Sequence, residues 1–319
     1  MPEKFRIFIT EPREHPALGR LRGLGEVRQG PSDRRMDERE LAGEVRDAHA
    51  VLITSRDRIT RPMIEHAAQL RVIGKFGARP ENVDWEAAQA RGVRIVWSPE
   101  ANSESVAEYT VLLILAHLRH LVEAVGHLRD GGWRNTFPQG RELRGRTVGL
   151  VGLGNVGSRV ARCLSGFGAT VLGHDPFLPP GRAAGLGVQL VALPDLLARA
   201  DVVSLHAMVT PETRHMIDEG ALRRMKPGAL LVNTARGALV DEAALARVLA
   251  EGRLGGACLD VFGQEPLLLP YPLLATPGVI ASPHIAAQTA EAQDREVTQT
   301  IDDVVRVLEG KDPVHTPPA

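Results

Sequence analysis

The chain of 319 residues has few cysteines, no long apolar run and almost no net charge. Its two cysteines, Cys163 and Cys258, are too few for a disulfide framework and lack metal-ligand spacing, so we expect reduced core residues and no metal. The longest apolar stretch in a predicted helix, residues 111–116, is far too short to cross a bilayer. A formal net charge of -1 provides no general attraction to nucleic acid or to a membrane surface.

The N-terminal sequence MPEKFRIFIT has charged residues where a signal peptide would have an apolar segment. We therefore expect a soluble, cytoplasmic protein. The length predicts two domains, and a composition of 44% hydrophobic and 24% charged residues is that of a globular chain.

Short apolar runs alternate with helical patterns along most of the chain, which predicts parallel sheets with helices between the strands. One long helix is predicted over residues 102–128, and a last helix over residues 290–308. The other predicted helices are residues 37–45, 59–70, 85–90, 156–167, 193–198, 220–225 and 241–251. The predicted strands are residues 5–10, 50–54, 72–76, 93–96, 148–151, 169–173, 188–191, 202–206, 229–234, 257–261 and 279–282.

Residues 147–176 have the order strand, glycine turn, helix, strand and acid. Gly152 allows a tight turn after the strand, Gly154 lets the backbone approach a pyrophosphate, and Gly157 lets the helix pack close to the strand. The pyrophosphate is expected on the free N–H groups at the start of the helix, near Asn155 and Val156. An ordinary glycine turn is the alternative, but the complete strand–helix–acid context favours a dinucleotide site.

Asp175 follows the second strand of this unit, 175 − 157 = 18 residues after the last glycine. An acid about 20 residues after the glycines binds the ribose 2′-OH of NAD. A carboxylate there also repels the 2′-phosphate of NADP, so we predict NAD as the cofactor.

Three chemically useful side chains follow later strands of the same predicted sheet. Arg236 follows strand 229–234, Glu265 follows strand 257–261, and His284 follows strand 279–282. Ligands of such sheets bind outside the carboxyl ends of the strands, so these side chains should share an edge with the cofactor. Each has an ordinary alternative, as a surface charge, a solvated loop residue or a helix cap.

The three side chains together suit hydride transfer to a 2-oxo acid. Arg236 can hold a carboxylate with two parallel hydrogen bonds and polarise the adjacent carbonyl. His284 can donate a proton to the carbonyl oxygen, or remove it in the oxidative direction. Glu265 would hold the other ring nitrogen and favour the imidazolium.

At this point the chain resembles the NAD-dependent D-2-hydroxyacid dehydrogenases, which include phosphoglycerate dehydrogenases and glyoxylate/hydroxypyruvate reductases. The resemblance is strongest between residues 72 and 289. It is carried by residues 102–110 (NSESVAEYT), 131–133 (GGW), 140–157 (GRELRGRTVGLVGLGNVG), 210–217 (TPETRHMI), 225–237 (MKPGALLVNTARG), 259–266 (LDVFGQEP) and 282–284 (SPH).

The resemblance implies the same catalytic residues, Arg236, Glu265 and His284. It adds His206, Thr234, Ala235 and Asp260 to the cofactor contacts, with Asp260 near the nicotinamide carboxamide. It also implies two Rossmann-like, doubly wound α/β domains with an interdomain active-site cleft. Residues 1–99 plus 290–319 would form the substrate domain, a lid, and residues 100–289 the NAD-binding domain.

The substrate loop departs from the family pattern G-x-G-x-D-N-x-D. Here Arg79 stands where glycine is usual, and Pro80 has no N–H and stiffens the loop. The resemblance implies that Ala78 and Arg79 hold the substrate carboxylate through their N–H groups, and that Asn102 also lies at the substrate. Arg79 either reaches into the cleft and favours a second anionic group, or points to solvent or braces Glu81.

The resemblance implies a homodimer or homotetramer, joined through the NAD-binding domain. The long helix from Asn102 is a candidate contact; burial within one subunit is the alternative. An NAD-sensing protein like the transcriptional corepressors that share this fold remains an alternative function, although a long interaction tail is not expected here. A formate or phosphite substrate is a further alternative that no sequence feature favours.

Overall fold

The structure is a computed structural model that describes residues 4–77 and 80–315. The chain divides into two compact units, Met1–Asn102 with Gln288–Ala319, and Ser103–Ala287. The first contains a five-stranded sheet and the second a seven-stranded sheet, both parallel throughout their described pairs. The predicted class, α/β with two doubly wound parallel sheets, is therefore confirmed. The interdomain cleft and the roles of the two units stay predictions.

The sheet of the first unit has the strand order β2-β1-β3-β4-β5. Its strands are β1 (Phe5–Ile9), β2 (Gly25–Gln29), β3 (Ala50–Ile53), β4 (Val72–Lys75) and β5 (Arg94–Trp97). Its helices are α1 (Leu18–Leu24), α2 (Glu38–Asp47), α3 (Arg61–His66), α4 (Trp85–Ala90) and α12 (Ala290–Leu308). Side chains of α2, α3 and α4 form one apolar layer with the strands, and those of α1 and α12 form the other.

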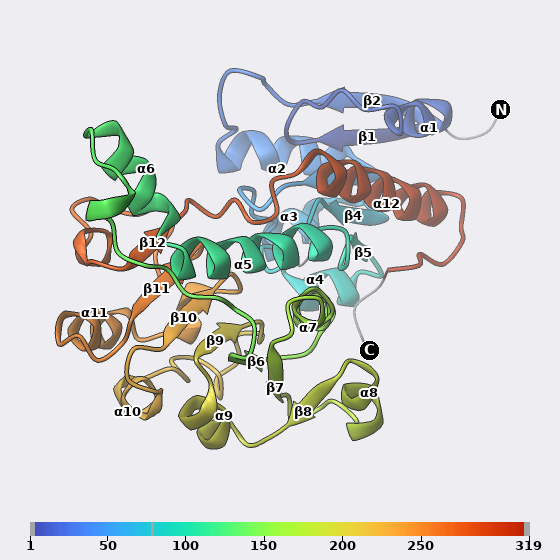
Figure 1. Ribbon diagram of the computed structural model, residues 1–319. Helices are drawn as coiled ribbons and strands as arrows, with labels where there is room; N and C mark the ends of the chain where they lie inside the picture. The colour runs from blue at the N-terminus through green and yellow to red at the C-terminus, as the bar shows by residue number, and fades with distance from the viewer. Residues whose placement is uncertain (1–3, 78–79, 316–319) are drawn as a thin grey trace. The chain divides into compact units, whose positions relative to one another are not determined.

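Helix α12 is the last element in the sequence, yet it packs against the five-stranded sheet, whose strands all lie within residues 5–97 (Figure 1). Its apolar residues recur at helical spacing, so Val297, Ile301, Val304 and Leu308 are all buried. Gly74 in β4 allows the close approach, because a Cβ there would lie 2.8 Å from Cγ2 of Val304. Both faces of the five-stranded sheet are thus covered within this unit.

Two elements of the first unit were not predicted from the sequence, α1 and β2. The α1 sequence LGRLRGL contains two glycines, which weaken a helical pattern. The β2 sequence GEVRQ forms an edge strand with no fully buried residue, so it lacks the apolar run that marks the other strands.

The sheet of the second unit has the order β12-β11-β10-β9-β6-β7-β8. Its strands are β6 (Thr147–Val151), β7 (Thr170–His174), β8 (Val188–Leu190), β9 (Val202–Leu205), β10 (Leu230–Asn233), β11 (Gly256–Leu259) and β12 (Val279–Ala281). Its helices are α5 (Ser103–Leu118), α6 (Leu121–Arg129), α7 (Asn155–Ser165), α8 (Pro180–Gly185), α9 (Leu193–Arg199), α10 (Glu219–Arg224) and α11 (Glu242–Ala250). Three short 3-10 helices are η1 (Arg134–Thr136), η2 (Gly237–Leu239) and η3 (Pro272–Ala275).

The strand order of this second sheet reverses between β6 and β9. Apolar residues of α5 and α7 pack on one face of the sheet, and those of α9, α10 and α11 pack on the other. Because all strands run parallel, their carboxyl ends share one edge, and in sheets of this kind ligands bind at that edge near the point of reversal. This edge is where the predicted site residues belong.

The predicted long helix over residues 102–128 is wrong, because two helices occupy it. Helix α5 ends at Leu118 and α6 begins at Leu121, with a bend of 57° between them. His120 between them has φ 50°, a left-handed conformation that cannot continue a right-handed helix. Among the described residues, no single helix is long and apolar enough to span a membrane; α5 and α6 meet that criterion only as a bent pair.

Candidate active site at the carboxyl edge of the second sheet

The glycine turn after β6 is closely packed at two of its three glycines. Gly152 has φ 91°, and a Cβ there would lie 2.7 Å from the carbonyl carbon of His206. A Cβ on Gly157 would overlap the carbonyl oxygen of Gly152. At Gly154, by contrast, a Cβ would meet no heavy atom within 4 Å. The loop is therefore tight on its protein side and open at the position predicted for the pyrophosphate.

Helix α7 begins directly after this loop, with Gly154 as its N-cap and Asn155 as its first residue. The first N–H groups of a helix have no acceptor within the helix and attract anions. Asn155 and Val156 therefore stand at the predicted pyrophosphate position. The open space at Gly154 and these donors fit a dinucleotide.

Asp175 follows β7 and lies beside the glycine loop. Its Oδ2 accepts a hydrogen bond from the N–H of Leu153 at 2.9 Å, and its Oδ1 accepts one from Phe177 at 3.0 Å. These bonds fix the carboxylate, and each oxygen retains a second lone pair for a ribose hydroxyl. The position fits the predicted selectivity for NAD.

Other predicted cofactor residues follow β9 and β10. Nε2 of His206 lies 3.0 Å from Oγ of Ser204, and burial lowers the pKa of His206 to about 4, so its ring is neutral. Thr234 is buried, with its Oγ1 2.8 Å from Oγ1 of Thr110. The N–H of Ala235 donates to Oδ1 of Asn233 at 3.0 Å.

Glu265 and His284 are joined directly by a hydrogen bond. Oε2 of Glu265 lies 2.6 Å from Nδ1 of His284, and Oε1 of Glu265 accepts from the N–H of Phe262 at 2.9 Å. His284 has φ 56°, and its N–H donates to the carbonyl oxygen of Asp260 at 2.8 Å. The loops after β11 and β12 thus bring together two residues that lie 19 positions apart.

The electrostatic setting of this pair favours an imidazolium–carboxylate pair. The hydrogen bond that His284 donates to Glu265 raises the pKa of His284 above its ordinary value, against opposing effects of burial and of the Arg236 charge. Burial acts to raise the pKa of Glu265, but hydrogen bonds from His284 and Phe262 and the charge of Arg236 hold it below its ordinary value. Because the Arg236 charge acts on both groups, all three belong to one site.

Arg236 is positioned by the end of β10. Its Nη1 donates to the carbonyl oxygen of Ala235 at 2.7 Å, and its own carbonyl oxygen accepts from Nδ2 of Asn233 at 2.9 Å. The next residue, Gly237, is needed for close packing, because a Cβ there would overlap the backbone of Phe262. The arginine loop and the loop that leads to Glu265 are therefore in backbone contact.

Asp260 is fully buried at the end of β11 and holds the segment that contains His284. Its Oδ1 accepts from Oγ of Ser282 at 2.6 Å and from the N–H of Ile285 at 2.9 Å. Its Oδ2 accepts from the N–H of Ala286 at 2.9 Å. The predicted contact of Asp260 with the cofactor stays a prediction; the observed contacts assign it a role in fixing residues 282–286.

Sequence reasoning missed several residues that support the site. Asn233 joins both sides of the arginine loop, and Ser282 binds Asp260. Glu242 accepts from the N–H of Gly263 at 2.8 Å and from the hydroxyl of Tyr271, which anchors the loop around Glu265. A polar residue at a strand end was a signal for Asn233, but nothing local marks the other contacts.

The predicted substrate residues are described only in part. Ala78 and Arg79 lie outside the described residues. Asn102 is half-buried, is the last residue of the first segment of unit 1, and directly precedes α5. Its contact with substrate stays a prediction.

Comparison with known proteins identifies relatives of the whole chain. Residues 111–286 match the family model described as D-isomer specific 2-hydroxyacid dehydrogenase, NAD binding domain. A D-3-phosphoglycerate dehydrogenase of Mycobacterium tuberculosis is 43% identical over 86% of this chain and 52% of its own length. A hydroxypyruvate reductase of Thermotoga maritima is 33% identical over 96% of this chain and 99% of its own length.

The solved structures include a glyoxylate reductase from Paecilomyes thermophila, with a TM-score of 0.89 and 28% identity. It matches over 100% of this chain and 99% of its own. The chain spans about half the length of the phosphoglycerate dehydrogenases it matches, as the 52% coverage above shows. The match to the NAD-binding family model confirms NAD as the cofactor. The chain belongs to the D-isomer specific 2-hydroxyacid dehydrogenase family.

Proposed function

We propose that the chain is an NAD-dependent oxidoreductase that interconverts D-2-hydroxy acids and 2-oxo acids. The observation that carries the proposal is the 2.6 Å hydrogen bond between Glu265 and His284 at the carboxyl edge of the second sheet. A histidine held in this way, with a raised pKa, suits proton transfer near neutral pH. The charge of Arg236 acts on the same pair.

The three side chains divide the work. Arg236 binds the substrate carboxylate and draws electron density from the adjacent carbonyl. When bound, NADH supplies the hydride for the carbonyl carbon. Nε2 of His284 gives its proton to the carbonyl oxygen as negative charge develops there, and takes that proton back in the oxidative direction. Glu265 holds Nδ1 and stabilises the imidazolium throughout.

The substrate side of the proposal rests on the first unit. Residues 1–99 plus 290–319 act as substrate domain, with Ala78, Arg79 and Asn102 as substrate contacts, and residues 100–289 as NAD-binding domain. Arg79 would favour a 2-oxo acid with a second anionic group. The test is Arg79→Gly, with rates compared on monoanionic and dianionic 2-oxo acids. If the ratio of the two rates is the same as in the parent, Arg79 does not contact the second anionic group.

The assembly side of the proposal is a homodimer or homotetramer joined through the NAD-binding domain. Helix α5 is the candidate contact. Its partly exposed residues include Leu112, of which 49% is exposed, although most of its apolar side chains are buried within the unit.

The test is NADH oxidation with glyoxylate, hydroxypyruvate, pyruvate, 3-phosphohydroxypyruvate and 2-oxoglutarate. We expect turnover of at least one compound, and its loss in His284→Gln with NADH affinity retained. His66→Gln, an exposed histidine at the end of α3, is the matched control and should keep full activity. Tight NADH binding without turnover of any compound would refute the enzyme and favour the NAD-sensing alternative.

A further inference from the structure

A pocket of about 290 Å³ lies at the opposite edge of the second sheet. Its lining includes Arg146, Asp201, Ala229 and Gly255, which directly precede β6, β9, β10 and β11. Because these strands are parallel, the pocket lies at their amino-terminal ends, away from the glycine loop and from His284. Its volume is close to the lower end for small-molecule sites.

The pocket has an excess of positive charge. Arg141, Arg146 and Lys226 line it, together with one carboxylate, that of Asp201. Nζ of Lys226 donates to Oδ1 of Asp201 at 3.0 Å, while Oδ2 accepts from the N–H of Thr147 at 2.8 Å. Both oxygens of Asp201 thus already accept hydrogen bonds, and Asp201 compensates the charge of Lys226.

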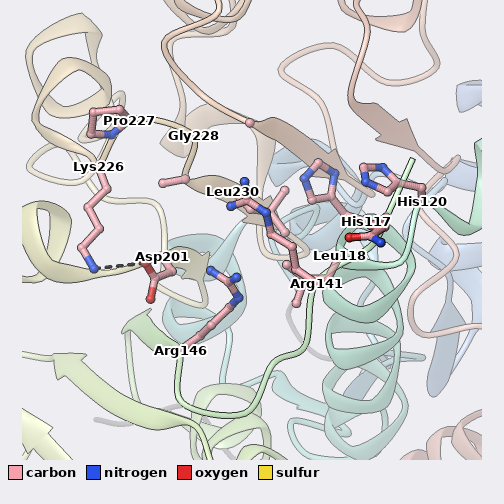
Figure 2. Close-up of a pocket in the computed structure, with 13 residues that line it drawn as sticks. His117, Leu118, His120, Arg141, Arg146, Asp201, Lys226, Pro227, Gly228 and Leu230 are labelled. Atoms are coloured by element: carbon pink, nitrogen blue, oxygen red, sulfur yellow. Dashed lines mark hydrogen bonds and ion pairs between the residues drawn. The ribbon is translucent and has the colours of Figure 1, made fainter. Parts of the chain in front are cut away.

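Neither guanidinium group forms a salt bridge in the described residues, although the charge of Arg146 also acts on Asp201. Nε of Arg146 donates to the backbone carbonyl oxygen of Glu142 at 2.8 Å, which carries no net charge. In the part of the chain that the structure describes, no carboxylate forms a salt bridge with Arg141 or Arg146. Figure 2 shows both side chains between the Lys226–Asp201 pair and His117.

His117 adds a neutral polar group on the other side of the two arginines. Burial lowers the pKa of His117, Glu123 on α6 opposes this, and the charges of His120 and Arg141 lower it further. Near neutral pH the ring is therefore uncharged and can donate or accept one hydrogen bond. The lining thus offers two guanidinium groups and the neutral ring of His117. With both lining histidines, His117 and His120, left out of the count, its net charge is about +2 (Arg141, Arg146 and Lys226 against Asp201).

We propose that this pocket binds a small dianion of the phosphate class, either inorganic phosphate or a phosphomonoester. Guanidinium groups match phosphate oxygens with parallel hydrogen bonds, and the lining's net charge of about +2 balances a charge of −2. The proposal is independent of the function proposed above, because none of its residues belongs to the catalytic or cofactor set.

The test is calorimetric titration of the full chain with inorganic phosphate at constant chloride, in saturating NADH so that the glycine loop is filled. We expect a Kd of about 1 mM or tighter, raised about tenfold in Arg141→Gln. Arg144→Gln is the matched control, since Arg144 is exposed on the same loop and does not line the pocket. A parallel titration with glycerol 3-phosphate distinguishes the two sources, since tighter binding than phosphate assigns the pocket to a phosphomonoester.

Three results would overturn the proposal. The first is no binding of either compound up to about 20 mM. The second is equal weakening by Arg141→Gln and Arg144→Gln, which would mean a general charge effect. The third is loss of phosphate binding in Arg236→Gln but not in Arg141→Gln, which would place the anion at the catalytic edge. Unchanged melting temperature and NADH affinity of Arg141→Gln establish that the variant is folded.

Discussion

Exchange of Glu265 for glutamine removes a negative charge beside His284 and preserves the shape of the side chain. A hydrogen bond to a charged group stabilises by about 1.5–3 kcal/mol. The side chains of His284 and Glu265 are 48% and 34% exposed, so solvent screens the pair and the lower value, about 1.5 kcal/mol, applies. That free energy corresponds to about a tenfold smaller protonated fraction of His284 at pH values above its pKa.

The assay is the pH profile of kcat/KM for 2-oxo acid reduction. Because Glu265 raises the pKa of His284, the parent keeps its proton donor to higher pH than a free histidine would. Glu265→Gln lowers that pKa, so we expect the alkaline limb to move to lower pH and kcat/KM at about pH 8 to fall about tenfold. As the pH falls, His284 becomes protonated in the variant as well, so the difference in kcat/KM should shrink toward low pH.

Glu251→Gln is the matched control, because Glu251 lies in the same unit and is hydrogen-bonded to Arg223 on the surface. Its pH profile should coincide with that of the parent. If the profile of Glu265→Gln also coincides with the parent, with melting temperature and NADH affinity unchanged, Glu265 does not control the protonation of His284 and the reasoning is refuted.

Other predictions concern the cofactor loop, the arginine loop and the stability of the histidine–carboxylate pair. Gly154→Ala should keep the melting temperature but raise the Kd for NADH about tenfold or more. Gly157→Ala should raise the Kd and also lower the melting temperature. Thermal unfolding measures the stability and fluorescence titration measures the Kd. Asp175→Ala should weaken NAD binding about tenfold, and equal affinity would disprove the ribose contact. Gly237→Ala should lower the free energy of unfolding by about 3 kcal/mol, because the added Cβ overlaps the backbone of Phe262. A denaturant midpoint equal to that of the parent would contradict this. The stability that His284 contributes is present below about pH 6.5 and is lost as pH rises through its raised pKa. The stability that Glu265 contributes is lost as pH falls through its lowered pKa. The difference in Tm between the parent and Glu265→Gln should therefore be largest near about pH 6.

Much of the fold could be predicted because its signals are local. Buried parallel strands are short apolar runs, and β3, β9 and β10 are buried along their whole length. The last helix has its predicted bounds, since its cap at Thr289 and its apolar spacing are both in the sequence. The break at His120 was not predictable, because residues on either side favour helix and only the backbone conformation separates α5 from α6.

The candidate site was predictable only as far as strand ends indicate it. Parallel strands place Arg236, Glu265 and His284 on one edge, so their proximity follows from topology. The contacts that orient them are non-local: Asp260 reaches residues 282–286, and Glu242 reaches Gly263 and Tyr271. Such contacts depend on how distant loops meet in space, and the spacing of apolar residues along the sequence does not indicate this.

The discontinuity of the first unit affects the order in which the chain can fold during its synthesis. The sheet face that α12 covers includes Ile7, Leu52 and Val72, all made within the first 72 residues. The whole of Ser103–Ala287 is translated before α12 exists, which takes about 10–40 s at about 5–20 residues per second. During that interval an apolar face of the first sheet is without its partner, while the second unit has every strand that it needs. During synthesis the second unit can therefore be complete before the first unit is.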